Sequence, residues 1–243
     1  IIPYRGSWLE FEIDQKKELI FAKIDKKKKI LGTIFLRALG FSTREEIIKS
    51  FYKTENVSVS SDAELREKLV DRVLAQAVII KNESGEEKRL FNAGTKLHPH
   101  DIDDLIANNI ESICVIVFDT RHNKEEINES LNSQMIINCF EREEVRYVRE
   151  GSIDNEPTKE DCLSAVFDIL KPGEPQTVES AEKDLYAMFF SERKYNLSRV
   201  GRYKLNKKFN RDDGIQDLTL VNQDIIDNHL TFVEAREIKE EAQ

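Results

Sequence analysis

The sequence predicts an α+β fold, a mixed helix and antiparallel-strand domain that carries an inserted small ββαβ unit. Three observations predict it. Apolar and polar residues alternate over residues 9–13, as they do in a half-buried strand. Apolar residues recur at helical spacing in two later stretches, 158–170 and 178–190. Finally, 40% of the 243 residues are hydrophobic and only 9 are glycine, so the chain can bury a core and is not collagen-like or of low complexity.

The first expected element is a β-hairpin over residues 8–24. The alternating run 9–13 can pair with the apolar run 19–24 through the polar turn 14–17. The only tryptophan, Trp8, falls on the face shared with acidic residues. An exposed aromatic side chain often serves recognition, whereas a residue that closes the rim of a core would show the same pattern.

A charged block follows the hairpin. It consists of Asp25, Lys26, Lys27, Lys28 and Lys29. The apolar segment 30–39 comes next, with Arg37 as its only charge, and it predicts a buried helix. Gly40 then stands where a helix C-cap favours glycine.

Residues 43–52 predict an amphipathic helix. Thr43 and Glu46 have the spacing of a capping box, in which each side chain bonds the backbone N–H of the other residue. The expected buried face comprises Ile47, Ile48, Phe51 and Tyr52.

The range 58–156 is predicted to hold an inserted ββαβ unit and its polar flanks. The flanks are residues 58–69 and 119–134. Its expected elements are a strand at 73–80, a turn at Ser84-Gly85, a return strand at 89–91, a helix that opens at Pro99 and a strand at 113–118. The expected division is therefore a first lobe part at 1–57, the inserted unit at 58–156, and a second lobe part at 157–243 with an acidic tail.

The second part predicts two helices and a basic segment. Pro157 and Thr158 open a helix that the motif Lys171-Pro172-Gly173-Glu174-Pro175 ends, and a further helix spans 178–190. Residues 191–211 then carry eight basic residues and one acidic residue, although the whole chain has a net charge of −9.

This basic segment interleaves bases with Tyr195, Tyr203 and Phe209. Such a mixture suits phosphate neutralisation with stacking, and it also suits a solvated helix that turns its aromatic residues into the core. Arg202 follows a glycine that permits close approach of a ligand. The acidic remainder argues against a freestanding DNA-coating protein and favours nucleic-acid contact on one face only.

The sequence also bears on the cellular location of the protein, on the state of its cysteines and on whether the chain is a fragment. No apolar run reaches the ~18–20 residues of a membrane span, and no secretion signal opens the chain, so we expect a cytosolic protein. Cys114, Cys139 and Cys162 predict buried free thiols. The chain begins at Ile1 without methionine, which suggests a piece of a longer protein.

The sequence predicts no active site contained within the chain. The run Ala93-Gly94-Thr95-Lys96 lacks the spacing of a phosphate-binding loop. His98, His100 and Asp101 could be drawn as ligands of a metal-dependent hydrolase, but polar residues that flank a proline at a helix start more often cap backbone N–H groups. No nucleophile has a positioned base.

Several motifs follow one another in a fixed order along the chain. They are Ile1 to Glu12, Ile24 to Lys28, Leu36 to Gly40, Lys171 to Pro175, Phe189 to Glu192 and Tyr195 to Lys204. Together they resemble the bacterial DNA-directed RNA polymerase β subunit at its lobe region, domain 2. The resemblance covers residues 1–55 and 157–211 and fades past Asp212, and residues 56–156 fall where the family tolerates lineage-specific insertions.

This resemblance implies a lobe that forms one wall of the downstream DNA channel and contacts the non-template strand. Trp8 would then stack on a base, Arg202 would bind base or phosphate, and Asp25 would orient the pocket. The lysines that would attract the DNA backbone are Lys26, Lys27, Lys28, Lys29 and Lys204.

The resemblance also implies a role within a larger nucleotidyltransferase. The Mg²⁺-binding aspartates belong to the β′ subunit, so this fragment is expected to be inactive alone and to hold no cofactor. Expected partners are DNA, the rest of the β subunit, the β′, α and ω subunits and the σ factor, in the cytoplasm at the bacterial nucleoid. The alternative is a protein-interaction module whose acidic insertion recruits transcription regulators.

Overall fold

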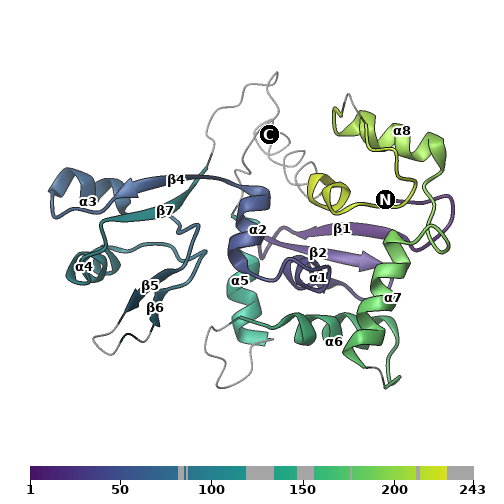
Figure 1. The fold of residues 1–243 in the computed structure, drawn as a ribbon, viewed down its shortest axis with the longest axis horizontal. Helices are drawn as coiled ribbons and strands as arrows, with labels where there is room; N and C mark the ends of the chain where they lie inside the picture. Colours follow the sequence, from purple (N-terminus) through teal and green to yellow (C-terminus); the bar gives the residue numbers. More distant parts are fainter. Residues whose placement is uncertain are drawn as a thin grey trace. The chain divides into compact units, whose positions relative to one another are not determined.

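The computed structural model describes residues 1–81, 85, 87–118, 134–146, 156–175, 177–211 and 214–228. They fall into two compact units (Figure 1). Unit 1 takes its described residues from 1–42, 133–150 and 156–243, and unit 2 takes them from 43–132. Mixed helices and small antiparallel sheets make up both units, which confirms the predicted α+β class. No helix among the described residues is long and apolar enough to cross a membrane.

Unit 1 begins with the predicted hairpin. Strands β1 (Leu9–Asp14) and β2 (Leu19–Ile24) pair antiparallel, with Leu9 opposite Ile24 and Asp14 opposite Leu19. The short strand β3 (Ile30–Leu31) adds to β2 as a third strand. The expected helix over 30–39 therefore starts later, because its first two residues pair with the sheet.

Helix α1 (Gly32–Ala38) lies at the centre of unit 1, and all seven of its residues are buried. Helices α5 (Met135–Arg146) and α6 (Lys159–Leu170) pack against it, and α7 (Val178–Phe190) packs against α6 (Figure 1). The starts of α6 and α7 and the motif that ends α6 agree with the sequence. Helix α5 was not predicted: the sequence analysis placed no element between the polar flank 119–134 and the helix that opens at Pro157.

The amino-terminal segment is tied to the segment before α8 (Ser198–Lys208). Arg5 and Asn196 form an isolated antiparallel bridge with N–O distances of 3.0 and 2.7 Å. Gly6 has a φ of +127°, and a Cβ built on it would lie 2.6 Å from Cδ2 of Tyr195. Glycine is therefore required here by both backbone conformation and space.

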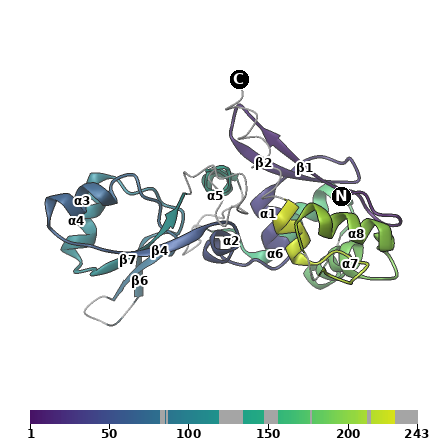
Figure 2. The ribbon, with the colours of Figure 1, turned by 90° about the horizontal axis from the view of Figure 1, so that it is seen from above.

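Unit 2 opens with α2 (Arg44–Phe51), whose predicted capping box is present between Thr43 and Glu46. Strand β4 (Lys53–Ser58) pairs antiparallel with β7 (Ser112–Val117), and β5 (Val78–Lys81) pairs with β6 (Glu87–Phe91). Helices α3 (Ala63–Leu69) and α4 (Pro99–Ala107) lie side by side (Figure 2). Their core contains Leu69, Leu74, Val78, Leu97, Ile102, Leu105, Ile113 and Val115.

The structure of unit 2 differs from the sequence prediction in three places. The strand expected over 73–80 is regular only in β5, because Val73 and Leu74 form isolated bridges to other segments. The polar flank 58–69 contains α3, a helix that the sequence analysis did not predict. Strand β4 was missed because its sequence is polar and its pairing with β7 is distant in the chain. The expected boundary between 57 and 58 falls inside β4; whether unit 2 is an insertion stays a prediction.

Candidate nucleic-acid interface

Trp8 is held by two hydrogen bonds to one residue at the exit of the hairpin. Its backbone N–H donates to Oδ1 of Asp25 at 2.7 Å, and its carbonyl accepts from the Asp25 N–H at 3.0 Å. Asp25 adopts a left-handed backbone with a φ of +49°. The half-buried indole therefore leaves the sheet at a fixed position, and Asp25 acts on it through the backbone.

The indole ring also has a cation beside it. The Lys26 ammonium lies 4.9 Å from the centroid of the Trp8 ring, within the range of a cation–π contact. Lys26 is the second left-handed residue of the turn, with a φ of +59°. A base that stacks on this indole would therefore lie next to the Lys26 cation.

The other three lysines of the block differ from one another. The Lys27 ammonium donates to the carbonyl oxygen of Leu170 at 2.9 Å. The Lys29 ammonium lies 3.4 Å from Oε1 of Glu12 and 4.6 Å from the Phe21 ring centroid. Lys28 is exposed, and within the described part of the chain its ammonium contacts no acidic, aromatic or carbonyl group. The block thus contains one cation that is free of described partners.

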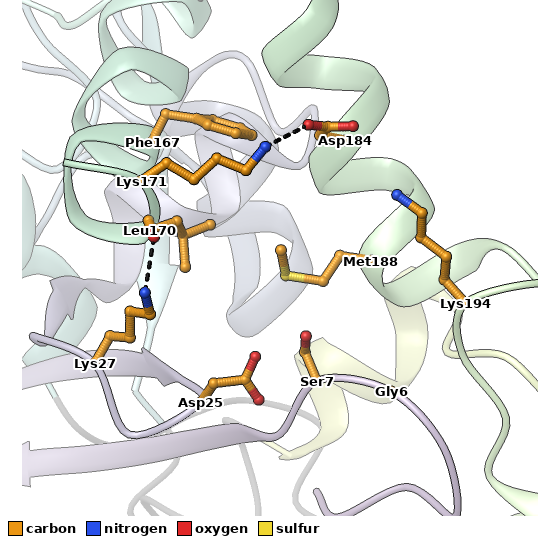
Figure 3. Close-up of a pocket in the computed structure, with 10 residues that line it drawn as sticks. All are labelled: Gly6, Ser7, Asp25, Lys27, Phe167, Leu170, Lys171, Asp184, Met188 and Lys194. Atoms are coloured by element: carbon orange, nitrogen blue, oxygen red, sulfur yellow. Dashed lines mark hydrogen bonds and ion pairs between the residues drawn. The ribbon is translucent and has the colours of Figure 1, made fainter. Parts of the chain in front are cut away.

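A pocket of about 450 Å³ lies beside this turn in unit 1 (Figure 3). Phe167, Leu170 and Met188 supply apolar walls, while the Ser7 hydroxyl and the Asp25 carboxylate lie at the opposite side. Its remaining lining residues are Gly6, Lys27, Lys171, Asp184 and Lys194. An apolar cavity with a few polar groups at its edge is the usual form of a small-ligand or base pocket.

Arg202 does not present a free guanidinium. Its side chain is 4% exposed, and its Nη1 donates to both carboxylate oxygens of Asp224 at 2.8 and 2.9 Å. Its Nε donates to the carbonyl of Asp217 at 2.5 Å, and its Nη2 donates to the carbonyl of Thr219. Burial and an internal carboxylate occupy the Arg202 guanidinium in this structure, and its expected direct contact with DNA stays a prediction.

The rest of the basic segment divides between core and surface. Tyr195 is fully buried, and burial raises the pKa of its hydroxyl well above the usual range. Tyr203 and Lys204 are exposed on α8. Burial lowers the pKa of Lys208, whose ammonium donates to Oδ1 of Asn228 at 3.0 Å. Lys204 is accessible to a partner, and its expected contact with DNA stays a prediction.

Comparison with known proteins assigns the chain to a family. The family model described as RNA polymerase Rpb2, domain 2, matches residues 1–98 and 115–232. The chain belongs to this family. It is 54% identical over 225 residues to the DNA-directed RNA polymerase subunit beta of Treponema denticola, which covers 93% of the chain and 19% of that relative.

Two further relatives carry the same name. The subunit beta of Treponema pallidum is 51% identical over 233 residues, which is 96% of the chain and 19% of the relative. The subunit beta of Borrelia hermsii is 44% identical over 213 residues, which is 88% of the chain and 18% of the relative. The chain therefore spans about a fifth of the length of these curated relatives.

The Rpb2 domain 2 chain also contains a buried charged cluster that the sequence analysis missed. The fully buried Arg37 lies 3.3 Å from Glu143 of α5 and 3.1 Å from Glu156, and it donates to the carbonyl of Ser42 at 2.6 Å. Burial disfavours its charged form, but the two carboxylates outweigh burial and raise the pKa of Arg37. The single charge in an apolar helix was the signal for this cluster.

His98 and His100 of this Rpb2 domain 2 chain lie at the start of α4, where His98 forms the expected capping arrangement with Asp101. The His98 N–H donates to Oδ2 of Asp101 at 2.8 Å at the start of α4, and Nε2 of His100 lies 3.2 Å from Oδ1 of Asp101. Across the described ranges, no group of three or more metal-ligating side chains is arranged to hold an ion. His122 and His229 lie outside the described residues.

Proposed function

We propose that this chain is part of the β subunit of a bacterial multisubunit DNA-directed RNA polymerase, a nucleotidyltransferase of transcription. Within that enzyme it is the lobe that forms one wall of the downstream DNA channel and contacts the non-template strand. Membership of the Rpb2 domain 2 family and the names of the relatives support the first statement. The observation that carries the second is the clamped Trp8 beside the lysine block.

In this proposal, one unstacked base of the non-template strand lies on the open face of Trp8. Stacking of a base on an aromatic side chain is worth ~1–3 kcal/mol and tolerates any base. Asp25 is a positioning residue here, since its carboxylate accepts the Trp8 N–H. Lysines near the ring attract phosphates in a way that weakens with salt.

The pocket beside the turn extends this contact. A base edge that presents N–H donors can donate to the second oxygen of the Asp25 carboxylate, while its ring packs on the apolar walls. The Ser7 hydroxyl, next to Trp8 in the chain, borders the same space (Figure 3). The apolar walls and the Asp25 carboxylate suit a base, and the lysines that also line the pocket can attract its phosphate.

The remaining parts of the proposal concern the whole enzyme. The chain has no catalytic centre or cofactor of its own, and Mg²⁺ is held by the β′ subunit. Partners are the rest of the β subunit, β′, α, ω and the σ factor, and the enzyme works in the cytoplasm at the nucleoid. Family membership supports the association with other polymerase subunits, and the remaining parts rest on the resemblance to the bacterial β subunit.

The test replaces Trp8 by alanine in the assembled polymerase and measures the lifetime of promoter complexes. Loss of a stacking contact of ~1–3 kcal/mol shortens the lifetime roughly 5- to 150-fold. Trp8→Phe keeps an aromatic face and should retain most of the lifetime. Equal lifetimes for wild type and Trp8→Ala would refute the contact and favour the protein-interaction module.

A further inference from the structure

The four consecutive lysines look equivalent in the sequence, but the structure gives each a different environment. All four are exposed, but Lys26 lies over the Trp8 ring, Lys27 bonds a helix carbonyl and Lys29 pairs with Glu12, whereas Lys28 has no such partner among the described residues. A cation that already holds a protein group gains less from a phosphate, because it must first give up that partner. The block therefore need not act as one continuous phosphate-binding patch.

Lys27 has the most specific partner of the four. Leu170 is the last residue of α6, and carbonyls in the last turn of a helix lack intrahelical partners. A positive charge at this end is also favoured by the helix dipole. The Lys27 ammonium thus satisfies a helix end that lies 143 positions away in the chain (Figure 3).

The same helix end is fixed on its other side. The Lys171 ammonium lies 3.0 Å from Oδ2 of Asp184 on α7, and this hydrogen bond raises the pKa of Lys171 (Figure 3). The carbonyl that receives Lys27 therefore belongs to a segment anchored to a second helix. It provides a firm attachment for the turn after the hairpin.

The turn requires such an attachment. Asp25 and Lys26 are consecutive left-handed residues that are not glycine, and each such conformation costs ~1–3 kcal/mol unless its surroundings hold it. The Lys27 N–H closes the turn on the carbonyl of Ile24 at 3.0 Å. Its side chain then joins the closed turn to α6.

We infer that Lys27 is a positioning residue, which anchors the turn on α6 so that Asp25 holds Trp8, whereas Lys28 is the lysine of the block that meets phosphate. This inference deepens the proposed non-template contact and rests on it for the role of Lys28. The anchoring role of Lys27 exists without DNA.

The first experiment measures binding of a labelled promoter fragment with an open bubble to the assembled polymerase over a salt series. The logarithm of the association constant falls as the logarithm of the salt concentration rises. Lys28→Met should make this negative slope shallower by about 0.7, the value for one contact to single-stranded DNA. Lys27→Met removes the same charge but should leave that slope unchanged and weaken binding at every salt concentration. Lys27→Arg, which can still donate to a carbonyl, should restore binding.

The second experiment follows amide hydrogen exchange in the same polymerase without DNA. Lys27→Met should speed exchange in peptides that contain residues 7–9 and 25–28, and Lys28→Met should not. Equal exchange in both variants, or an equal loss of slope in both, would overturn the anchoring role. If instead Lys28→Met and Trp8→Ala leave DNA binding unchanged while Lys27→Met speeds exchange, the non-template contact fails and the anchor stands.

Discussion

A buried guanidinium needs an acceptor for each direction in which it donates, and Arg202 has three. Asp224 supplies a carboxylate, and Asp217 and Thr219 supply carbonyls. Asp224 itself is fully buried and also accepts from Arg211 at 2.7 Å. Removal of either arginine changes the charge balance around one buried carboxylate, so these residues act as a unit.

Arg202→Ala should therefore destabilise the chain. Breaking a buried ion pair by removing one partner costs about 3–5 kcal/mol, and Arg211 reduces this by keeping Asp224 partly neutralised. Chemical denaturation of the chain measures the loss. Lys204→Ala, an exposed position on the same helix, should change stability by less than about 0.5 kcal/mol. A loss of similar size in both variants would contradict the buried network.

At the level of elements, the start of α6 depends on a local cap. The Thr158 hydroxyl accepts from the Asp161 N–H at 3.2 Å, and the Asp161 carboxylate accepts from the Thr158 N–H at 3.3 Å. Both bonds satisfy N–H groups that the first turn of a helix leaves without partners. Helix α6 also carries Leu170 at its other end, so its position bears on the turn next to Trp8.

Thr158→Ala should lower the free energy of unfolding by about 1 kcal/mol, the usual cost of losing an N-cap. The urea midpoints of wild type and Thr158→Ala, compared at equal m-value, measure this loss of stability. Thr158→Ser keeps the capping hydroxyl and serves as the control. A Thr158→Ala midpoint equal to that of the serine variant would show that the cap contributes nothing.

Elements with strong local signals could be predicted from the sequence. The hairpin, α6 and α7 have clear periodicity, caps or helix-ending motifs within a few residues. Strand β4 could not be predicted, because its polar residues form a strand only by pairing with β7. At the site, exposure of the lysine block was foreseeable, whereas the Lys27–Leu170 bond joins distant segments and leaves no local trace.

On the scale of the whole molecule, the three cysteine thiols are divided between the two units and differ in burial. Cys114 is half-buried in unit 2, while Cys139 and Cys162 are buried in unit 1. Burial raises the pKa of both Cys139 and Cys162 to about 12. The predicted free thiols are thus confirmed, with Cys114 more accessible than expected.

Native protein at pH 8 should react with a maleimide first at Cys114, since the buried thiols are both inaccessible and protonated. Mass spectrometry of labelled peptides identifies the order, and urea should make all three react. Since the folded pKa values exceed the usual thiol value of about 9, unfolded thiols ionise first as pH rises, and stability should fall above pH 9. Rapid native labelling of Cys139 would contradict this burial.

Gly6, two residues before Trp8, limits how this chain can change over generations. A Cβ there would lie 2.6 Å from Cδ2 of Tyr195, and also 3.1 Å from the carbonyl oxygen of Lys194 and 3.2 Å from Cα of Tyr195, so a smaller side chain at position 195 would not make room for it. The φ of +127° is also unsuitable for a residue with a Cβ. A smaller residue at 195 alone would leave a cavity, and any change at position 6 would still clash with the backbone, so neither order of mutation offers a neutral intermediate. Glycine at position 6 therefore cannot be replaced through a series of low-cost single mutations. This constraint keeps the path of the backbone into Trp8 unchanged.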